Sequence, residues 1–465
     1  MTLAEAINVA LRLNRSVKSA YLQRVVDKFS LRVEEDKFKP NVDFSANLNY
    51  ADSATKTAPD WGKSESSNTG GTDTLAVTQM IPTGGGFVFS WSRSDLWART
   101  NFSEKDRNDT NTWTVNFTQP LLKGAGIDVN TASLTLAKLN EQSNLLSLKD
   151  SISSTVSATI AAFRSYAQTT RQLEIIKSSL KRAKDLLEMN KFLISVGRMA
   201  ANELIQTESD VANQEFSYET SLNDLDNARL NLLKILNLDK STMIIPKEEG
   251  EPTAVHPDFD RCLKTAFENR SDFLNSNMGM EKAKISLTLA QNNMLWNLNF
   301  AGDYAITDAN QRLSSDSDNQ KWTVGLNLTI PLYGELTREQ GLVGAQVSLK
   351  QTELALDELT ENITIEVQNA IREVETKLKQ VGMAQRAREL SEKKLEVEGE
   401  KLKVGRTTNF QMVTFQNDLV NAQNEELNAS IAFRNALTAL DNILGTTLNT
   451  WKIDYNKEYD KWPGK

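Results

Sequence analysis

Several common classes of protein are excluded by what this sequence lacks. Its 465 residues include one cysteine and one histidine, so no disulfide can form within one chain. No run of about 18 apolar residues occurs, which argues against a transmembrane helix. The net charge is −8 and no basic cluster is interleaved with aromatic residues, so the sequence does not favour a nucleic-acid partner.

No residue pattern typical of an active site or a cofactor site is present either. His256 stands beside Pro257 with no nucleophile or metal ligand at a suitable spacing, which is typical of a surface loop. The glycines at 84–86 lack the following Lys-Ser or Lys-Thr and the helix that complete a phosphate-binding loop. We therefore expect no enzymatic activity, no bound metal and no cofactor.

The most informative feature that is present is an internal repeat. Residues that align between the two halves are Ala10, Val17 and Phe44 with Ala266, Phe273 and Phe300, and Val196-Gly197-Arg198 with Val404-Gly405-Arg406. The segment WTVNFTQPLLKG from Trp113 likewise matches WTVGLNLTIPLYG from Trp322. We expect each half to build the same unit of helices and strands. The first repeat would cover residues 1–240 and the second 258–445, with a linker at 241–257 and a C-terminal tail at 446–465.

A very long helix is predicted in each repeat. From about residue 128 to 195 there is no proline, and apolar residues recur at alternating intervals of three and four. The second repeat shows the same pattern from about Leu336 to Lys403. This stripe is typical of a helix that packs against neighbours along its whole length. At 1.5 Å per residue, about 68 residues span roughly 100 Å, so we expect a rod or a tube.

The pattern of the long helices fits either a solvated coiled coil or a wall with water on both sides. The strands distinguish between these two interpretations. Apolar and polar residues alternate at Val42–Tyr50, Phe87–Trp91, Trp113–Phe117, Leu298–Ile306 and Trp322–Ile330. A half-buried sheet with one wet face shows such alternation, but the aromatic residues gathered here are typical of barrels that face lipid. We expect transmembrane strands within 41–119 and 297–330, joined by exposed polar loops at 51–71, 98–111 and 308–320.

One chain supplies too few strands to close a useful barrel. An open sheet edge is not tolerated in lipid, because its backbone polar groups have no partner there. The chain must therefore associate with further copies to close the barrel.

In the order and duplication of its segments, the whole chain resembles the TolC-like outer-membrane factor family. The segments that carry the resemblance are LAEAINVALRLNRSV near the start, QPLLKG at Gln119, IPLYG at Ile330, the two Val-Gly-Arg turns, and ALTALDNILG ending at Gly445. The resemblance implies an α+β membrane protein that forms a homotrimer. Its long α-helical coiled-coil tunnel would lie in the periplasm, continuous with a transmembrane antiparallel β-barrel in the outer membrane.

The family resemblance also implies a function and partners. The trimer would be an exit duct that passively conducts substrates for a tripartite efflux pump or a type I secretion system. Its partners would be outer-membrane lipid, a periplasmic adaptor (membrane fusion) protein and an inner-membrane transporter. The alternative is a structural or scaffolding coiled-coil protein without a pore.

One departure from the family concerns the number of strands. Members usually contribute four strands per protomer, but an insertion at about 53–111 holds two further strand-like pieces, Thr74–Met80 and Phe87–Leu96. The trimer would have 18 strands if these pieces join the barrel, and 12 if they form an extracellular hairpin above it. We favour the wider barrel, because Phe87, Phe89 and Trp91 on one face need lipid or protein to bury them.

The two Val-Gly-Arg turns each lie between long helices, where glycine adopts the left-handed conformation that ends a helix. By resemblance, these turns form the periplasmic tips on which the adaptor docks. The residues expected at the tips are Gly197, Arg198, Met199, Gly405, Arg406 and Thr407.

The resemblance further implies a periplasmic gate just past the turns. The best-known members place two aspartates there, one helical turn apart, but this chain has Gln411 and Thr414. After the first turn, the matching positions hold Glu203 and Gln206. The cation-binding constriction of the family is therefore reduced here to at most one acidic ring, from Glu203.

Overall fold

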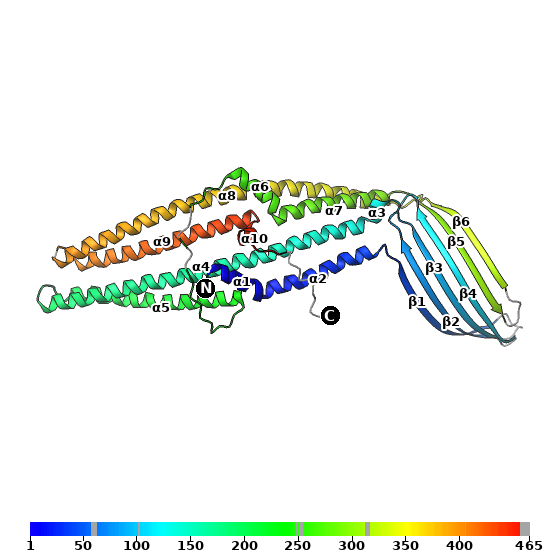
Figure 1. The fold of residues 1–465 in the computed structure, drawn as a ribbon, viewed down its shortest axis with the longest axis horizontal. Coiled ribbons are helices and arrows are strands. Elements are labelled where there is room, and N and C mark those ends of the chain that lie inside the picture. The colour runs from blue at the N-terminus through cyan, green and yellow to red at the C-terminus, as the bar shows by residue number, and fades with distance from the viewer. Residues whose placement is uncertain are drawn as a thin grey trace. The chain divides into compact units, whose positions relative to one another are not determined.

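The structure is a computed structural model that describes residues 1–56, 63–100, 103–247, 250, 254–311, 317–404 and 406–455. Its elements, labelled in Figure 1, are α1 (Leu3–Leu13), α2 (Arg15–Asp36), β1 (Asn41–Lys56), β2 (Lys63–Met80), β3 (Gly86–Thr100), β4 (Ser103–Pro120), α3 (Ile127–Asn130), α4 (Ala132–Ser195), α5 (Glu203–Leu236), α6 (Phe259–Asn269), α7 (Ser271–Asn293), β5 (Asn297–Gln311), β6 (Ser317–Thr329), α8 (Leu336–Lys403), α9 (Asn409–Ile443) and α10 (Thr447–Thr450).

The predicted long helices are confirmed, with 64 residues in α4 and 68 in α8. The chain forms two compact units, and each takes segments from both halves of the sequence. One unit comprises Met1–Val26, Ser143–Asn277 and Ala355–Lys465, and is called the helical unit below. The other comprises Asp27–Gln142 and Met278–Leu354, and is called the sheet unit. Within the described residues, none of the helices combines the length and the apolar character of a membrane span.

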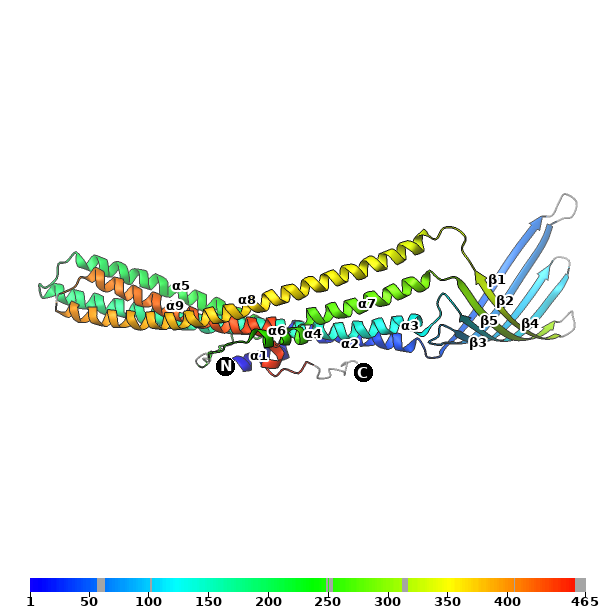
Figure 2. The same cartoon turned by 90° about the horizontal axis from the view of Figure 1, so that it is seen from above.

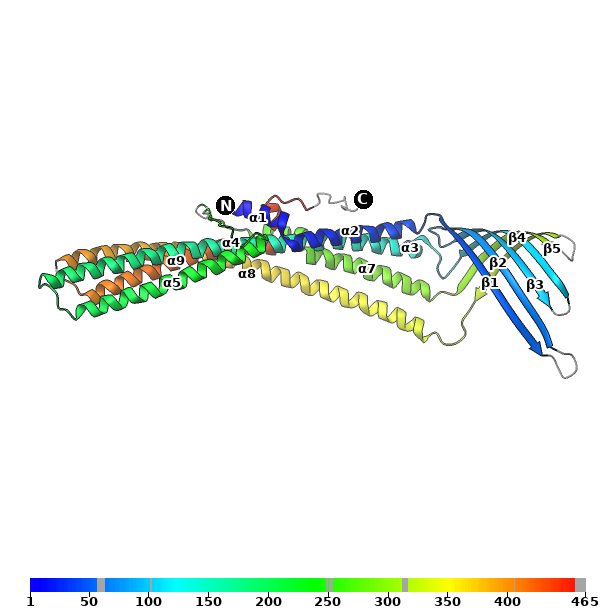
Figure 3. The ribbon, with the colours of Figure 1, turned by 90° about the horizontal axis from the view of Figure 1, so that it is seen from below.

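The sheet unit contains one antiparallel sheet of six strands in the order β1-β2-β3-β4-β5-β6. Every strand therefore pairs with its neighbours in sequence, while β1 and β6 each keep one open edge. Figures 2 and 3 show the sheet from opposite sides together with the helices that lead into it. The insertion at 53–111 is thus part of the sheet, because β2 and β3 lie between β1 and β4.

The strand register separates apolar from polar side chains. Partners on one face include Phe44 opposite Leu75, Leu75 opposite Trp91, Trp91 opposite Trp113 and Trp113 opposite Ile306. On the other face, Ser45 lies opposite Thr74, and Thr74 lies opposite Ser92. Because side chains alternate between faces along a strand, the alternation in the sequence gives the sheet one apolar and one polar face.

The expectation of long polar loops between the strands was wrong for most of their length. β1 continues to Lys56 and β2 begins at Lys63, while β3 and β4 extend to Thr100 and Ser103 and β5 and β6 to Gln311 and Ser317. The antiparallel ladder is built from backbone groups, so a strand pair with a fixed register continues through polar side chains. The remaining loop residues, 57–62, 101–102 and 312–316, lie outside the described residues.

The helical unit is held together by two apolar cores of the same construction. In the first, Ile7 of α1 packs with Ile152, Val156 and Phe163 of α4 and with Leu233 of α5, all nearly inaccessible to water. The second combines Ala266 of α6, Ile363 and Val367 of α8, and Phe433 and Leu440 of α9. Each fully buried side chain of this size contributes about 1.5–3 kcal/mol, so these cores hold a short helix against the long helix and the returning helix.

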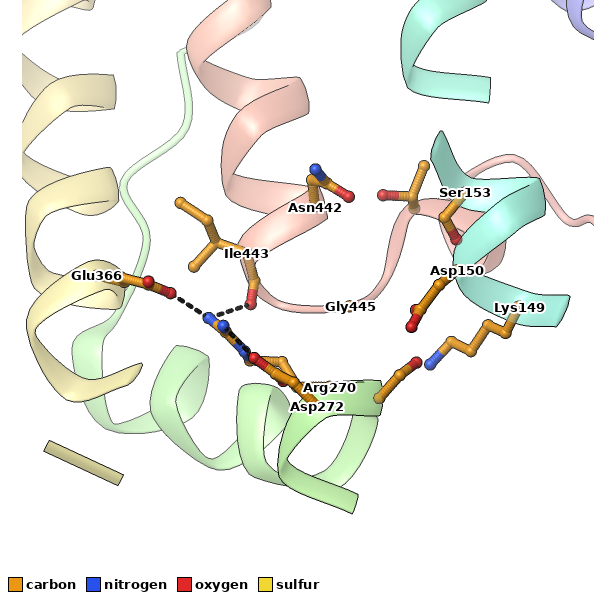
Figure 4. Close-up of a pocket in the computed structure, with 11 residues that line it drawn as sticks. Lys149, Asp150, Ser153, Arg270, Asp272, Glu366, Asn442, Ile443 and Gly445 are labelled. Carbon is orange, nitrogen blue, oxygen red and sulfur yellow. Dashed lines mark hydrogen bonds and ion pairs between the residues drawn. The ribbon is translucent and has the colours of Figure 1, made fainter. Parts of the chain in front are cut away.

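Two cations cap helix ends where α6 meets α7 (Figure 4). Lys149 of α4 donates from Nζ to the carbonyl of Asn269, the last residue of α6, at 2.5 Å. Arg270 donates from Nη1 to the carbonyl of Ile443, the last residue of α9, at 3.4 Å. Both cations therefore sit at the negative ends of helix dipoles. Burial lowers the pKa of Lys149, and the charge of the neighbouring Asp150 opposes this shift.

Arg270 also ties three elements together. Its side chain, 14% exposed, bonds both carboxylate oxygens of Asp272 at 3.0 and 2.7 Å and reaches Glu366 of α8 at 2.5 Å. The nearby Gly445 has a φ of 69°, and a Cβ there would lie 2.7 Å from the Asn269 carbonyl oxygen. The end of α9 therefore packs directly on the backbone of the α6–α7 junction, a close approach that only glycine permits.

We predict that Arg270→Ala lowers the free energy of unfolding by about 1–3 kcal/mol, because it leaves two carboxylates and a carbonyl without their donor. Thermal unfolding in detergent should show the loss as a Tm lower by roughly 2–6 °C. Arg15, in the matching Asn-Arg-Ser triplet between α1 and α2, is exposed. Arg15→Ala is therefore the control, with an expected change within about 0.5 kcal/mol. Equal effects of the two substitutions would contradict the role of Arg270.

Candidate functional site at the helix tips

The first tip follows α4, which ends in a Schellman motif. The N–H of Gly197 donates to the Ile194 carbonyl at 3.0 Å, and the N–H of Arg198 donates to the Leu193 carbonyl at 2.9 Å. Gly197 has a φ of 74°, the left-handed conformation that this motif requires and that glycine adopts without strain. Arg198 is exposed, whereas Met199 is half-buried.

The second tip has a matching bond at the end of α8. There the N–H of Arg406 donates to the Lys401 carbonyl at 2.9 Å, and Arg406 is exposed. Gly405, predicted as the capping glycine, lies outside the described residues. The next helix, α9, is preceded by Thr408, whose hydroxyl accepts from the N–H of Gln411 at 3.3 Å. This is an ordinary N-cap, which satisfies one of the free N–H groups at the helix start.

A buried asparagine connects the two tips. Asn409, 2% exposed, donates from Nδ2 to Glu203 Oε2 and to Met199 Sδ, each at 3.3 Å. Met199, a predicted tip residue, and Glu203, a predicted gate residue, therefore both contact one side chain of α9. Sequence reasoning did not identify Asn409, although a polar residue directly after an N-cap threonine was a visible signal.

A carboxylate anchors the second tip from the side of α8. Glu398, 3% exposed, accepts a hydrogen bond from the hydroxyl of Thr407 and one from Lys401 Nζ at 3.0 Å. These hydrogen bonds, that from Thr407 first, lower the pKa of the Glu398 carboxyl. The charged form is thus favoured at neutral pH, and it holds Thr407 against α8.

The remaining gate candidates are not brought together within one chain. Gln206, Gln411 and Thr414 are all exposed. The hydroxyl of Thr414 donates to the Phe410 carbonyl of its own helix at 2.8 Å. These side chains therefore remain accessible to solvent or to another chain.

Behind the tips lies a layer of buried polar residues that sequence reasoning missed. Asn190 of α4 donates from Nδ2 to Thr207 Oγ1 of α5 at 2.8 Å, and both are fully buried. About two turns further along α5, Gln214 donates to Asn417 Oδ1 of α9 at 3.2 Å. Buried polar groups are retained only when they are hydrogen-bonded, so the layer requires that α4, α5 and α9 keep this alignment.

Asp210 lies in the same layer, 6% exposed. Burial raises the pKa of its carboxyl, and hydrogen bonds with Gln214 and Asn417 oppose the shift. Its negative charge therefore destabilises the closely packed arrangement as the pH rises through that raised pKa. A signal for it existed in the sequence, because Asp210 immediately precedes Val211, which recurs with Leu204 and Tyr218 at intervals of seven.

Large apolar side chains are exposed around both tips. The exposed fractions are 64% for Phe192, 50% for Val196, 70% for Ile205, 64% for Val404 and 68% for Phe410. Isolated exposed apolar residues are ordinary, but a group around two neighbouring turns is typical of a surface that contacts another protein. Only Val196 and Val404 belonged to the predicted turn motifs.

The tips do not have the composition of a metal or cofactor site. Among the residues that the structure describes, no three His, Cys, Asp or Glu side chains gather closely enough to hold a metal ion. What the tips offer is two exposed arginines, exposed apolar side chains and a polar layer behind them. Such an arrangement suits contact with another protein and movement between neighbouring helices.

Comparison with known proteins identifies relatives of this fold. Residues 262–446 match the family model described as "Outer membrane efflux protein". A comparison of the sequence with curated proteins finds no match.

Solved structures of outer-membrane channels are similar over nearly the whole chain. The Campylobacter jejuni CmeC outer membrane channel has a TM-score of 0.67 at 14% identity, with 98% of this chain and 89% of that chain covered. VceC from Vibrio cholerae has a TM-score of 0.69 at 15% identity, with 95% and 96% covered. The open state of the Neisseria gonorrhoeae MtrE channel has a TM-score of 0.66 at 14% identity, with 96% and 89% covered.

The predicted combination of long helices and an antiparallel sheet is thus the fold of known outer-membrane channels. The resemblance to the TolC-like outer-membrane factor family is confirmed by the outer membrane efflux protein match over residues 262–446 and by this fold over nearly the whole chain.

Proposed function

We propose that this chain is one subunit of a homotrimeric outer-membrane exit duct, which passively conducts substrates in a tripartite efflux pump or a type I secretion system. The observation that carries the proposal is the six-stranded sheet, with one apolar aromatic face, one polar face and two open edges. A scaffolding coiled coil would need the helices but not this sheet. The similarity to outer-membrane channels supports the same function, and those proteins are not enzymes.

The open sheet edges support association with further copies of this chain. Among the strands that the structure describes, β1 pairs only with β2, and β6 pairs only with β5. On these edge strands Leu48 is 89% exposed and Trp322 is 76% exposed. In lipid the free backbone groups of both edges need partners, and β6 of one copy can pair with β1 of the next to satisfy them.

The helices next to these edges carry exposed apolar stripes. On α8, which follows β6, the stripe comprises Leu336, Val343, Val347 and Leu354 at intervals of seven, four and seven, 49–79% exposed. On α2, which precedes β1, Phe29 and Val33 are 63% and 56% exposed. Intervals of four and seven are those of a coiled-coil seam. When β6 of one copy pairs with β1 of the next, the helices beside these strands would also come together and cover both stripes.

The tips are the proposed docking surface for a periplasmic adaptor protein. Arg198 and Arg406 supply exposed charge, and Phe192 and Phe410 supply exposed apolar surface beside them. The Schellman cap at Gly197 fixes the direction of the first tip. A rigid turn with mixed apolar and cationic side chains suits recognition of another helical protein without a large loss of entropy.

The gate is proposed to lie just behind the tips. Contacts available to hold it closed are the Asn409–Glu203 bond and the buried layer with Asp210. Because Gln411 and Thr414 are uncharged, the only acidic ring from the four gate positions would come from Glu203. A ring of carboxylates in a narrow passage binds cations, because the cation relieves their mutual repulsion.

We therefore predict weak block by divalent cations in single-channel recordings of the native protein. Gln411→Asp combined with Thr414→Asp should create strong block, since it adds two acidic rings. Glu203→Gln should abolish the residual native block.

The control for the gate experiment is Glu208→Gln on the same helix, where the side chain is exposed. It should leave the native block unchanged. Strong native block that survives Glu203→Gln would contradict the assignment of the gate.

A second prediction concerns the tips. Arg198→Glu combined with Arg406→Glu should weaken adaptor binding at least about tenfold, or about 1.4 kcal/mol, because it reverses the charge of both turns. Crosslinking in cells, followed by mass spectrometry of the proteins recovered with the duct, measures the change. Arg12→Glu, at an exposed position on α1, should leave recovery unchanged. Equal recovery of adaptor with all variants would exclude docking at the tips.

A further inference from the structure

The hairpin of β2 and β3 is built into the sheet along its full length. β1 pairs with β2 from Asn41 opposite Thr78 to Lys56 opposite Lys63. β3 pairs with β4 from Gly86 opposite Thr118 to beyond Trp97 opposite Arg107. An extracellular hairpin would require β1 to pair with β4 directly, but here β1 and β4 pair with β2 and β3 instead.

The turn between β2 and β3 is fixed among the same residues that join the strands to the helices. The Thr83 carbonyl accepts from the N–H of Gly126 at 3.2 Å and from Gln119 Nε2 at 3.1 Å. Gly84, with a φ of 99°, packs so closely that a Cβ would lie 2.3 Å from the Gly124 carbonyl oxygen. This end of the hairpin is thus anchored at the level where β4 ends and α3 begins.

The hairpin also follows the face pattern of the other strands. Phe87 and Phe89 lie on the apolar face and contact Phe117 and Trp113, with ring centroids 4.5 and 5.8 Å apart. Beyond Trp91 the same face carries ion pairs between Arg93 or Arg107 and Asp95 or Asp109, at 2.9–3.9 Å. A charged side chain on a lipid-facing surface costs the most free energy at mid-membrane and little near the interface. The change from apolar to charged side chains beyond Trp91 is therefore typical of the end of a membrane-spanning strand.

The polar face is nearly free of charge across all the strands. On β3 and β4 it carries Ser90, Ser92 and Ser94 opposite Thr114, Thr112 and Thr110. Among the strand residues whose side chains the structure describes, the charged ones in register with this face are Asp43, Asp303 and Lys321. A wall of hydroxyl and amide groups wets easily but generates little net field.

We propose that the β2–β3 hairpin is a wall segment of a widened barrel, which three copies of six strands close with 18 strands around a polar lumen with few charges. The inference rests on the proposed trimeric duct. With strands about 4.8 Å apart and tilted by about 40°, 18 strands give a backbone diameter of roughly 36 Å, against roughly 24 Å for 12. Barrels of 16–18 strands leave an aqueous channel. The outer-membrane part then admits bulky hydrophilic solutes of either charge. Which substrates are conducted is determined by the helical part and its partners.

Single cysteines on opposite faces of the hairpin test this directly. The background is Cys262→Ser, which removes the one native cysteine. Ser90→Cys probes the polar face of β3, Thr114→Cys probes its register partner on β4, and Phe89→Cys probes the apolar face one residue away. Each protein is placed in a planar bilayer and treated with a bulky, water-soluble, membrane-impermeant methanethiosulfonate.

We expect Ser90→Cys and Thr114→Cys each to lose current in three steps, one for each copy. Phe89→Cys should keep its full current and should react instead with a lipid-soluble maleimide. Cationic and anionic reagents should modify Ser90→Cys at rates within about threefold of each other, because a charged lumen would separate them by tenfold or more.

The outcomes distinguish failure of this inference from failure of the proposed function. If Thr114→Cys is blocked but Ser90→Cys is not, the hairpin lies outside the wall, and the wide barrel is overturned while the duct stands. If neither position is blocked, or the steps are not three, the trimeric duct itself fails. Rates that differ by tenfold between the cationic and the anionic reagent would overturn the inference that the lumen carries few charges.

Discussion

The structure depends on one constraint, which is that every backbone N–H and C=O group within a membrane needs a hydrogen-bond partner. The six strands satisfy this constraint between one another, but the outer edges of β1 and β6 do not. Those edges are continuous in sequence with α2 and α8, whose apolar stripes are likewise uncovered. The proposed association therefore pairs the open strand edges and also covers the apolar stripes of the helices. It explains why so many large apolar side chains are exposed in a single chain.

The helical unit shows a gradient of stability along its long helices. Two large apolar cores hold α4 with α1 and α5, and α8 with α6 and α9. Near the tips the apolar contacts shrink to a small group around Leu186, Leu402 and Val413, and buried polar residues such as Asn190 and Asp210 replace the rest. Segments with few buried apolar contacts open at the lowest free-energy cost. The tips are thus suited to movement, while the cores and the Arg270 junction keep the helices in place.

The sequence was sufficient to predict the fold because the main helices and strands are long and periodic. The intervals of three and four gave α8 its bounds, and the alternation at Val42–Tyr50 located β1 and its apolar face. The lengths of the strands could not be predicted, because backbone pairing continues into segments such as Lys63–Gly71 that carry no apolar pattern. The contact of Asn409 with Glu203 was also beyond the sequence, because it joins residues about 200 positions apart through packing that no local pattern records.

The central claim is that the chain completes its sheet only with two further copies. Native mass spectrometry of the protein in mild detergent tests this claim most directly. The chain has a mass of 52.0 kDa, so three times 52.0 kDa predicts a single species at about 156 kDa. A stable, folded species at the mass of one chain, with the sheet edges open, would contradict the account.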